Sequence, residues 1–100
     1  MKNTYSFEKE NGIFICYLNY EDEDDFRDFL NFVCQKLGLP VPEITEAAYA
    51  TLAVLGVEGI SVTASYNTDT GCYLHFPLGC NVLAKKVIQK CYGSPEGADL

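Results

Sequence analysis

A run of acidic side chains leads directly into the most amphipathic stretch of the chain, residues 19–38. This stretch reads Asn19-Tyr20-Glu21-Asp22-Glu23-Asp24-Asp25-Phe26-Arg27-Asp28-Phe29-Leu30-Asn31-Phe32-Val33-Cys34-Gln35-Lys36-Leu37-Gly38. Apolar residues recur in it at the spacing of one helix face, as Phe26, Phe29, Leu30, Val33 and Leu37. Asp22 is suited to the N-cap, where a carboxylate accepts a hydrogen bond from the first turn. Gly38 is suited to the left-handed position that ends a helix. The pattern therefore predicts an α-helix between these two residues.

The five consecutive acids, residues 21–25, exceed what a helix cap needs. Carboxylates packed together repel one another, so such a cluster persists when it is solvated or matched by a basic partner. Two interpretations remain open: a solvated helix start, and part of a docking site for a basic protein. A calcium site is disfavoured, because the run lacks the glycine and the distal glutamate of a calcium-binding loop.

Length and composition indicate one domain with a substantial core. The chain has 100 residues, of which 48% are hydrophobic and 13% aromatic. We expect residues 1–93 to form a single globular domain and residues 94–100 to form a flexible tail.

The net charge of −7 disfavours binding to nucleic acids and to anionic membranes. Residues 1–50 hold ten acids against four bases, whereas residues 51–100 hold four against three. A partner steered by charge should therefore meet the N-terminal half.

The chain contains five cysteines, an odd number without a CxxC pair: Cys16, Cys34, Cys72, Cys80 and Cys91. Each lies among apolar residues, which is typical of buried thiols in a reducing compartment. No apolar segment of signal-peptide or membrane-spanning length is present. We therefore expect a cytoplasmic protein.

The remaining pattern predicts two hairpins and further helices. Strands are expected at residues 4–7, 13–20, 60–66 and 72–76, with Asn11-Gly12 at the first turn and residues 67–71 at the second. A final helix is expected at residues 82–92, capped by Asn81. Residues 43–55 read as an alanine-rich helix, and the alternative is a strand over residues 49–55. The resulting order is β-β-α-α-β-β-α, an α+β fold in which helices pack on one face of an antiparallel sheet.

Two strand faces are open to more than one interpretation. Residues 13–18 are apolar on both faces, so the strand is either covered on both sides or uses one face for binding. A second face combines hydroxyl and aromatic side chains, namely Ser61, Thr63, Ser65, Tyr73 and His75. It fits an ordinary solvated sheet face or a protein interface.

Nothing in the sequence favours catalysis. His75 is the only histidine, and strand alternation places the nearest thiol, Cys72, on the opposite face. A zinc site using Cys72, His75 and Cys80 lacks a fourth ligand. No glycine-rich phosphate loop or nucleophile elbow is present. We expect a protein without enzymatic activity, cofactor or metal.

The chain resembles the small immunity proteins of bacteria. The features that carry the resemblance are its size, its acidity, the run from Glu21 to Asp25, a hairpin at the start and reduced cysteines. These immunity proteins act against toxin domains such as those of contact-dependent growth inhibition systems. The resemblance implies an inhibitor that masks a basic toxin domain, often a nuclease, with carboxylates placed where phosphates would lie. The expected partner-binding residues are Tyr20, Glu21, Asp22, Glu23, Asp24, Asp25 and Asp28. The oligomeric state is left open.

A second resemblance is local. Residues 29–40, Phe29-Leu30-Asn31-Phe32-Val33-Cys34-Gln35-Lys36-Leu37-Gly38-Leu39-Pro40, look like the first helix of type III secretion chaperones. Those proteins usually begin with that helix, whereas a hairpin precedes it here. This resemblance implies a homodimer that wraps an extended apolar segment, and an immunity protein would instead bind a folded basic domain.

Overall fold

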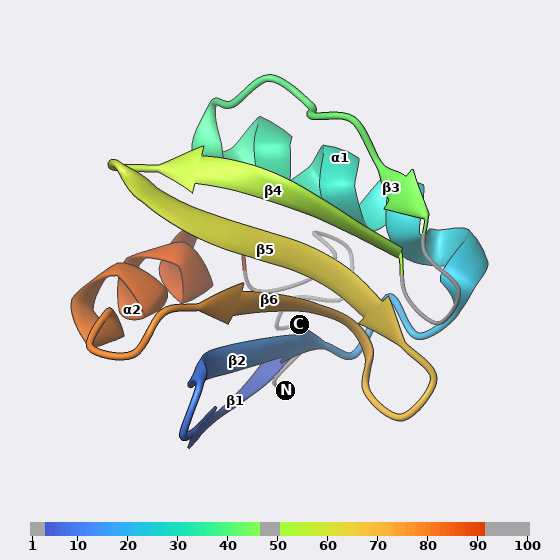
Figure 1. The fold of residues 1–100 in the computed structure, drawn as a ribbon. Helices are drawn as coiled ribbons and strands as arrows, with labels where there is room; N and C mark the ends of the chain where they lie inside the picture. Colours follow the sequence, from blue (N-terminus) through green and yellow to red (C-terminus); the bar gives the residue numbers. More distant parts are fainter. Residues whose placement is uncertain (1–3, 47–50, 92–100) are drawn as a thin grey trace.

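Six strands form one antiparallel sheet in the computed structural model, which describes residues 4–46 and 51–91 (Figure 1). The strands are β1 Thr4–Lys9, β2 Gly12–Tyr17, β3 Thr45–Glu46, β4 Thr51–Val57, β5 Ile60–Asn67 and β6 Gly71–Phe76. The helices are the 3-10 turn η1 Glu23–Asp25, α1 Phe26–Leu37 and α2 Asn81–Lys90. The strand order β1-β2-β6-β5-β4-β3 places the N-terminal hairpin beside the β5–β6 hairpin.

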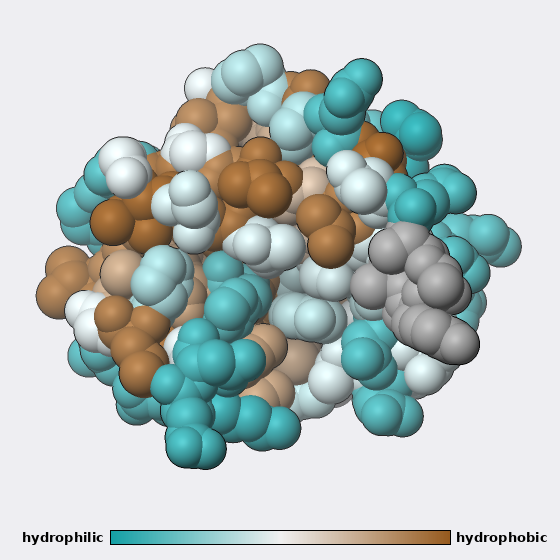
Figure 2. Space-filling model, viewed as in Figure 1, coloured by the Kyte–Doolittle hydropathy of each residue, from teal (hydrophilic) through white to brown (hydrophobic). Residues whose placement is uncertain are grey.

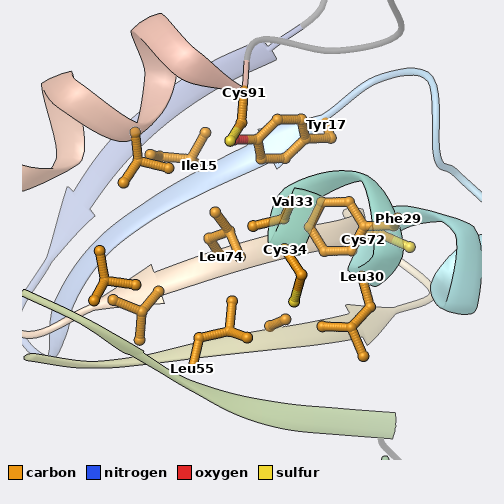
Figure 3. Close-up of a cluster of buried hydrophobic side chains, with 14 of the residues drawn as sticks. Ile15, Tyr17, Phe29, Leu30, Val33, Cys34, Leu55, Cys72, Leu74 and Cys91 are labelled. Carbon is orange, nitrogen blue, oxygen red and sulfur yellow. The ribbon is translucent and has the colours of Figure 1, made fainter. Parts of the chain in front are cut away.

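Both helices pack on the same face of the sheet, which confirms the predicted α+β class. In Figure 1, α1 passes behind β4. Alternate residues of β2 point into the core, so that Ile13, Ile15 and Tyr17 are buried together with Leu74 of β6. Figure 3 shows this cluster between the sheet and the helices. We call the opposite side of the sheet the outer face.

Helix α1 forms as its apolar spacing predicts. Phe26, Phe29, Leu30 and Val33 are buried against the sheet. Gly38 ends the helix in the left-handed region with φ +70°. The N–H of Gly38 donates to the carbonyl of residue 35 at 3.3 Å, and the next N–H donates to residue 34 at 2.9 Å. These two bonds form a Schellman cap, which satisfies carbonyls left free at the helix end.

The prediction of a helix over residues 43–55 was wrong. The structure has strands β3 and β4 there, and residues 47–50 lie outside the described part. In β4, Ala53, Leu55 and Val57 are buried, whereas Val54 is exposed, which is the two-residue period of a strand. Pairing with β5 along the whole of β4 therefore outweighs the alanine-rich helix propensity. The alternative strand over residues 49–55 was the closer interpretation.

The turns also differ in detail from expectation. The β1–β2 turn consists of Glu10 and Asn11, and Gly12 is already the first residue of β2. A Cβ on Gly12 would collide with the carbonyl of Phe76 and the ring of His75. This glycine therefore permits the close approach of β6. The predicted strand over residues 13–20 ends at Tyr17, because the chain there turns toward η1.

The C-terminal part agrees in outline with the prediction. Helix α2 spans Asn81–Lys90, so Asn81 is its first residue and Cys80 takes the N-cap position. Leu83, Ala84 and Val87 are its buried residues. The predicted tail, residues 94–100, lies outside the described residues.

Candidate functional site: the acidic end of the sheet

The acidic run is held across the end of the β5–β6 hairpin. The N–H of Cys72 donates to the carbonyl of Tyr20 at 2.8 Å. Gly71 adopts φ +78°, and a Cβ on it would lie 3.0 Å from the Cα of Glu21 and from the carbonyl oxygen of Tyr20. Glycine is therefore required where the two segments cross. The crossing fixes the acids at one end of the sheet.

Two of the predicted acids shape the turn that begins the helix. The N–H of Asp22 donates to the carboxylate of Asp25 at 3.2 Å, and the N–H of Asp25 donates to the backbone carbonyl of Asp22 at 2.9 Å. Asp22 has an extended backbone and is the N-cap of the short turn η1, whereas the N-cap of α1 itself is Asp25, three residues later than predicted. Asp25, which is half-buried, holds the turn with its carboxylate.

The other acids face solvent. Glu21, Glu23, Asp24 and Asp28 are all exposed. Within residues 4–46 and 51–91, a single ion pair is present, and it joins Lys86 Nζ to Glu58 Oε1 at 3.4 Å. No described cation therefore forms an ion pair with the acidic run, and solvent and more distant charges such as that of Arg27 relieve its mutual repulsion.

Tyr20 lies partly in the core. Its ring centroid is 5.6 Å from that of Phe29 and 5.9 Å from that of Phe32. The packed ring of Tyr20 therefore anchors the start of the acidic run to the core. Only part of the ring is exposed beside the acids.

A groove of about 380 Å³ opens on one side of the run. Its walls combine apolar and acidic side chains, among them Tyr5, Leu18, Glu21, Asp22, Tyr66 and Asp69. On the other side, a second groove of about 250 Å³ is lined by residues that include Glu23, Asp24, Arg27, Ile44 and Glu46. The run is thus a ridge between two hollows.

Sequence reasoning missed Asp69 and Glu46. Both belong to segments distant in sequence, and the fold brings them to the predicted acids. The turn over residues 67–71 was expected, and the N–H of Asp69 donates to the side-chain oxygen of Asn67 at 2.7 Å. Nothing in the sequence indicated that this turn would lie beside residues 20–22.

The negative charge influences the groups beneath the run. Burial, with a further contribution from Asp25 and Asp22, raises the pKa of the Cys72 thiol to about 12. The Sγ of Cys72 lies 3.9 Å from the carbonyl oxygen of Asp22. Loss of hydration, and then Glu23 and Asp22, raise the pKa of Tyr66. Burial therefore contributes most to both shifts, and the nearby carboxylates add to it.

His75 lies on the outer face, away from the acidic end. Its Nε2 is 2.9 Å from the carbonyl oxygen of Asn11, and its ring packs 4.6 Å from that of Phe14. Cys72 is buried in the core on the opposite face, so strand alternation separates the two as predicted. Among the described residues, no group of three or more His, Cys, Asp or Glu side chains is arranged to hold a metal ion.

Comparison of the chain with protein-family models, with curated proteins and with solved structures finds no match. Within the described part of the chain, neither helix is long and apolar enough to span a membrane.

Proposed function

We propose that this chain is a non-enzymatic binding protein that neutralises a basic toxin domain of bacterial type by covering its active or substrate-binding surface. The observation that carries the proposal is the ridge of exposed carboxylates, which forms no ion pair with a described residue. A nuclease is one kind of basic domain that fits, because its phosphate-binding surface attracts carboxylates.

The position of the charge supports this proposal. The crossing at Gly71 and the capped turn at Asp22 hold the acids on ordered backbone, so binding does not require the ridge to fold first. Exposed charges concentrated at one end steer an oppositely charged partner and speed its association. We propose a cytoplasmic location, with which the five free cysteines are consistent.

A capture experiment tests the proposal. The full chain is immobilised, exposed to a lysate of the native host and washed at low and then high salt, and eluted proteins are identified by mass and isoelectric point. We expect a single basic domain that salt releases, and adding the purified chain should abolish that domain's activity.

The variant Glu21→Gln, Glu23→Gln, Asp24→Asn tests the proposed site. It leaves Asp22 and Asp25 in place for the turn. It should fold and capture less of the partner. A partner retained at high salt through an unfolded apolar segment would instead favour the chaperone alternative. Capture that is independent of these three acids would refute the proposed site.

A further inference from the structure

The outer face of the sheet carries a continuous strip of five rings, which we call the aromatic strip. Its members come from three neighbouring strands and are Tyr5, Phe7, Phe14, Tyr73 and His75. Ring centroids are 6.1 Å apart for Tyr5–Phe7, 5.1 Å for Phe7–Phe14, 5.6 Å for Phe14–Tyr73 and 4.6 Å for Phe14–His75. Both helices pack on the other face, so neither covers the strip.

The aromatic strip is accessible and runs into the acidic end. Tyr5 is 45% exposed, and the other four rings are half-buried. Tyr5 also lines the larger groove, where Leu18 is 42% exposed and Glu21, Asp22 and Asp69 supply carboxylates. In Figure 2, seen as in Figure 1, brown and pale side chains occupy the middle of this face, and teal side chains gather both at the right-hand edge and at the lower left over the β1–β2 hairpin. The aromatic strip and the groove therefore meet at Tyr5, which belongs to both.

We infer that this surface receives an arginine-bearing loop or strand of the basic partner, with the arginine in the groove and its neighbours across the aromatic strip. The inference rests on the proposed function and identifies the group that the site recognises. It also extends the interface beyond the seven residues predicted from the sequence.

The chemistry of the groove favours arginine over lysine. A guanidinium stacks on aromatic rings and forms paired hydrogen bonds with carboxylates, whereas an ammonium acts as a hydrated point charge. Tyr5 and Tyr66 supply rings, and three acids supply oxygens. At the β1–β2 turn end of the strip, away from the groove, Lys9 Nζ lies 5.4 Å from the ring centroid of Phe7, so the rings can contact a cation of either kind. The apolar walls accommodate the aliphatic stem.

Two short peptides test the inference without the natural partner. The probes are N-acetylated, C-amidated Gly-Val-Arg-Val-Gly and its lysine counterpart, titrated into the full chain while its NMR spectrum is recorded. The arginine peptide should shift resonances of Tyr5, Leu18, Asp69 and the rings of the strip. Its dissociation constant should be lower than that of the lysine peptide by about threefold, the size expected for an exposed cation–π contact.

Two substitutions in the groove and one elsewhere on the outer face separate the contributions. Tyr5→Ser and Asp69→Asn should each abolish the preference for arginine. Val54→Ser, an exposed outer-face position on β4, should preserve it. Circular dichroism verifies that each variant folds.

Equal binding of both peptides, with shifts confined to residues 21–28, would overturn the inference and leave the proposed function standing, since that requires only a cation. Absence of binding by either peptide would also overturn it. The proposed function is then judged independently by the lysate capture, so the two failures are distinguishable.

Discussion

At the scale of single residues, Gly71 determines where the acidic run lies. Its φ of +78° is costly for any residue with a Cβ. The backbone of Tyr20 and Glu21 also passes so close to Gly71 that a Cβ there would contact it. A left-handed backbone alone costs about 1–2 kcal/mol for a residue with a Cβ. The contact with two backbone atoms adds to that cost, because backbone cannot rotate away as a side chain can.

Gly71→Ala should therefore lower the free energy of unfolding by more than about 2 kcal/mol. The control is Gly59→Ala, because Gly59 has φ +82° and a Cβ there would meet nothing within 4 Å. Urea unfolding of both variants measures the difference. Equal losses of stability would show that the crossing is not tight.

Tyr17 supplies a second residue-scale prediction. Its ring is fully buried beside Phe29 and Cys91, as Figure 3 shows, and its hydroxyl has no hydrogen-bond partner among the described residues. An unsatisfied buried hydroxyl costs about 1–3 kcal/mol. Tyr17→Phe should accordingly raise the free energy of unfolding by about 1 kcal/mol. Thermal and urea unfolding test this, and a destabilised variant would reveal a partner for the hydroxyl.

At the scale of elements, the acids of η1 have different roles. The carboxylate of Asp25 accepts the N–H of Asp22, whereas Asp24 is exposed and makes no such bond. Asp25→Ala should cost about 1 kcal/mol, the usual value of a lost helix cap. Asp24→Ala should change stability by less than about 0.5 kcal/mol. Urea unfolding measures both, and equal effects would contradict this division of roles.

Elements whose signal is local were predictable from the sequence. Helix α1 carries its own apolar stripe, N-cap and C-terminal glycine, so its sequence specifies it without reference to the rest of the chain. The segment 43–55 does not, because β4 is a strand through its pairing with β5. Local propensity cannot report a partner that the fold supplies.

The candidate site also has a part that was predictable from the sequence and a part that only the fold brings together. The acids at residues 21–25 are consecutive and were evident from the sequence. Asp69 reaches them only because the β5–β6 turn folds under residues 20–22. The aromatic strip was also hidden, because it requires β2 to lie between β1 and β6. Tyr73 and His75 were identified as outward-facing, but their neighbours Phe7 and Phe14 were not.

At the scale of the whole molecule, buried thiols make stability depend on alkaline pH. Burial raises the pKa of Cys72 and of Cys91 to about 12, from the ordinary value of 9.0. Well below pH 9 both thiols are protonated in folded and unfolded chains alike, so the full stability is present. As the pH rises from 9 to 12, the unfolded chain loses these protons first, and stability falls.

Each thiol should contribute a loss of about 1.4 kcal/mol per pH unit within that range. The measurement is the free energy of unfolding in urea at pH 8 to 11 under reducing conditions. Cys72→Ala should reduce the slope by about 1.4 kcal/mol per pH unit and leave the contribution of Cys91, whatever its effect on stability at pH 8. An unchanged slope in this variant would contradict the assigned cause.

The distribution of charge over the molecule permits a matched test of the proposed function. The acidic run lies beside the β5–β6 turn, whereas Glu8 in β1 and the turns that carry Glu10 and Glu58 lie toward the opposite end of the sheet, where Glu58 pairs with Lys86. Three acids can therefore be neutralised at either end with the same change in net charge. The contribution of net charge to long-range attraction would be equal for the two variants, so a difference between their rates reports the location of the interface.

The most direct measurement is the association rate of the captured basic partner, recorded by stopped flow as a function of salt. It compares the wild type with Glu21→Gln, Glu23→Gln, Asp24→Asn and with Glu8→Gln, Glu10→Gln, Glu58→Gln. We predict that the first variant associates about tenfold more slowly at low salt and depends less on salt, while the second stays close to the wild type. Equal rates for the two variants would contradict the claim that the acidic end of the sheet is the binding site.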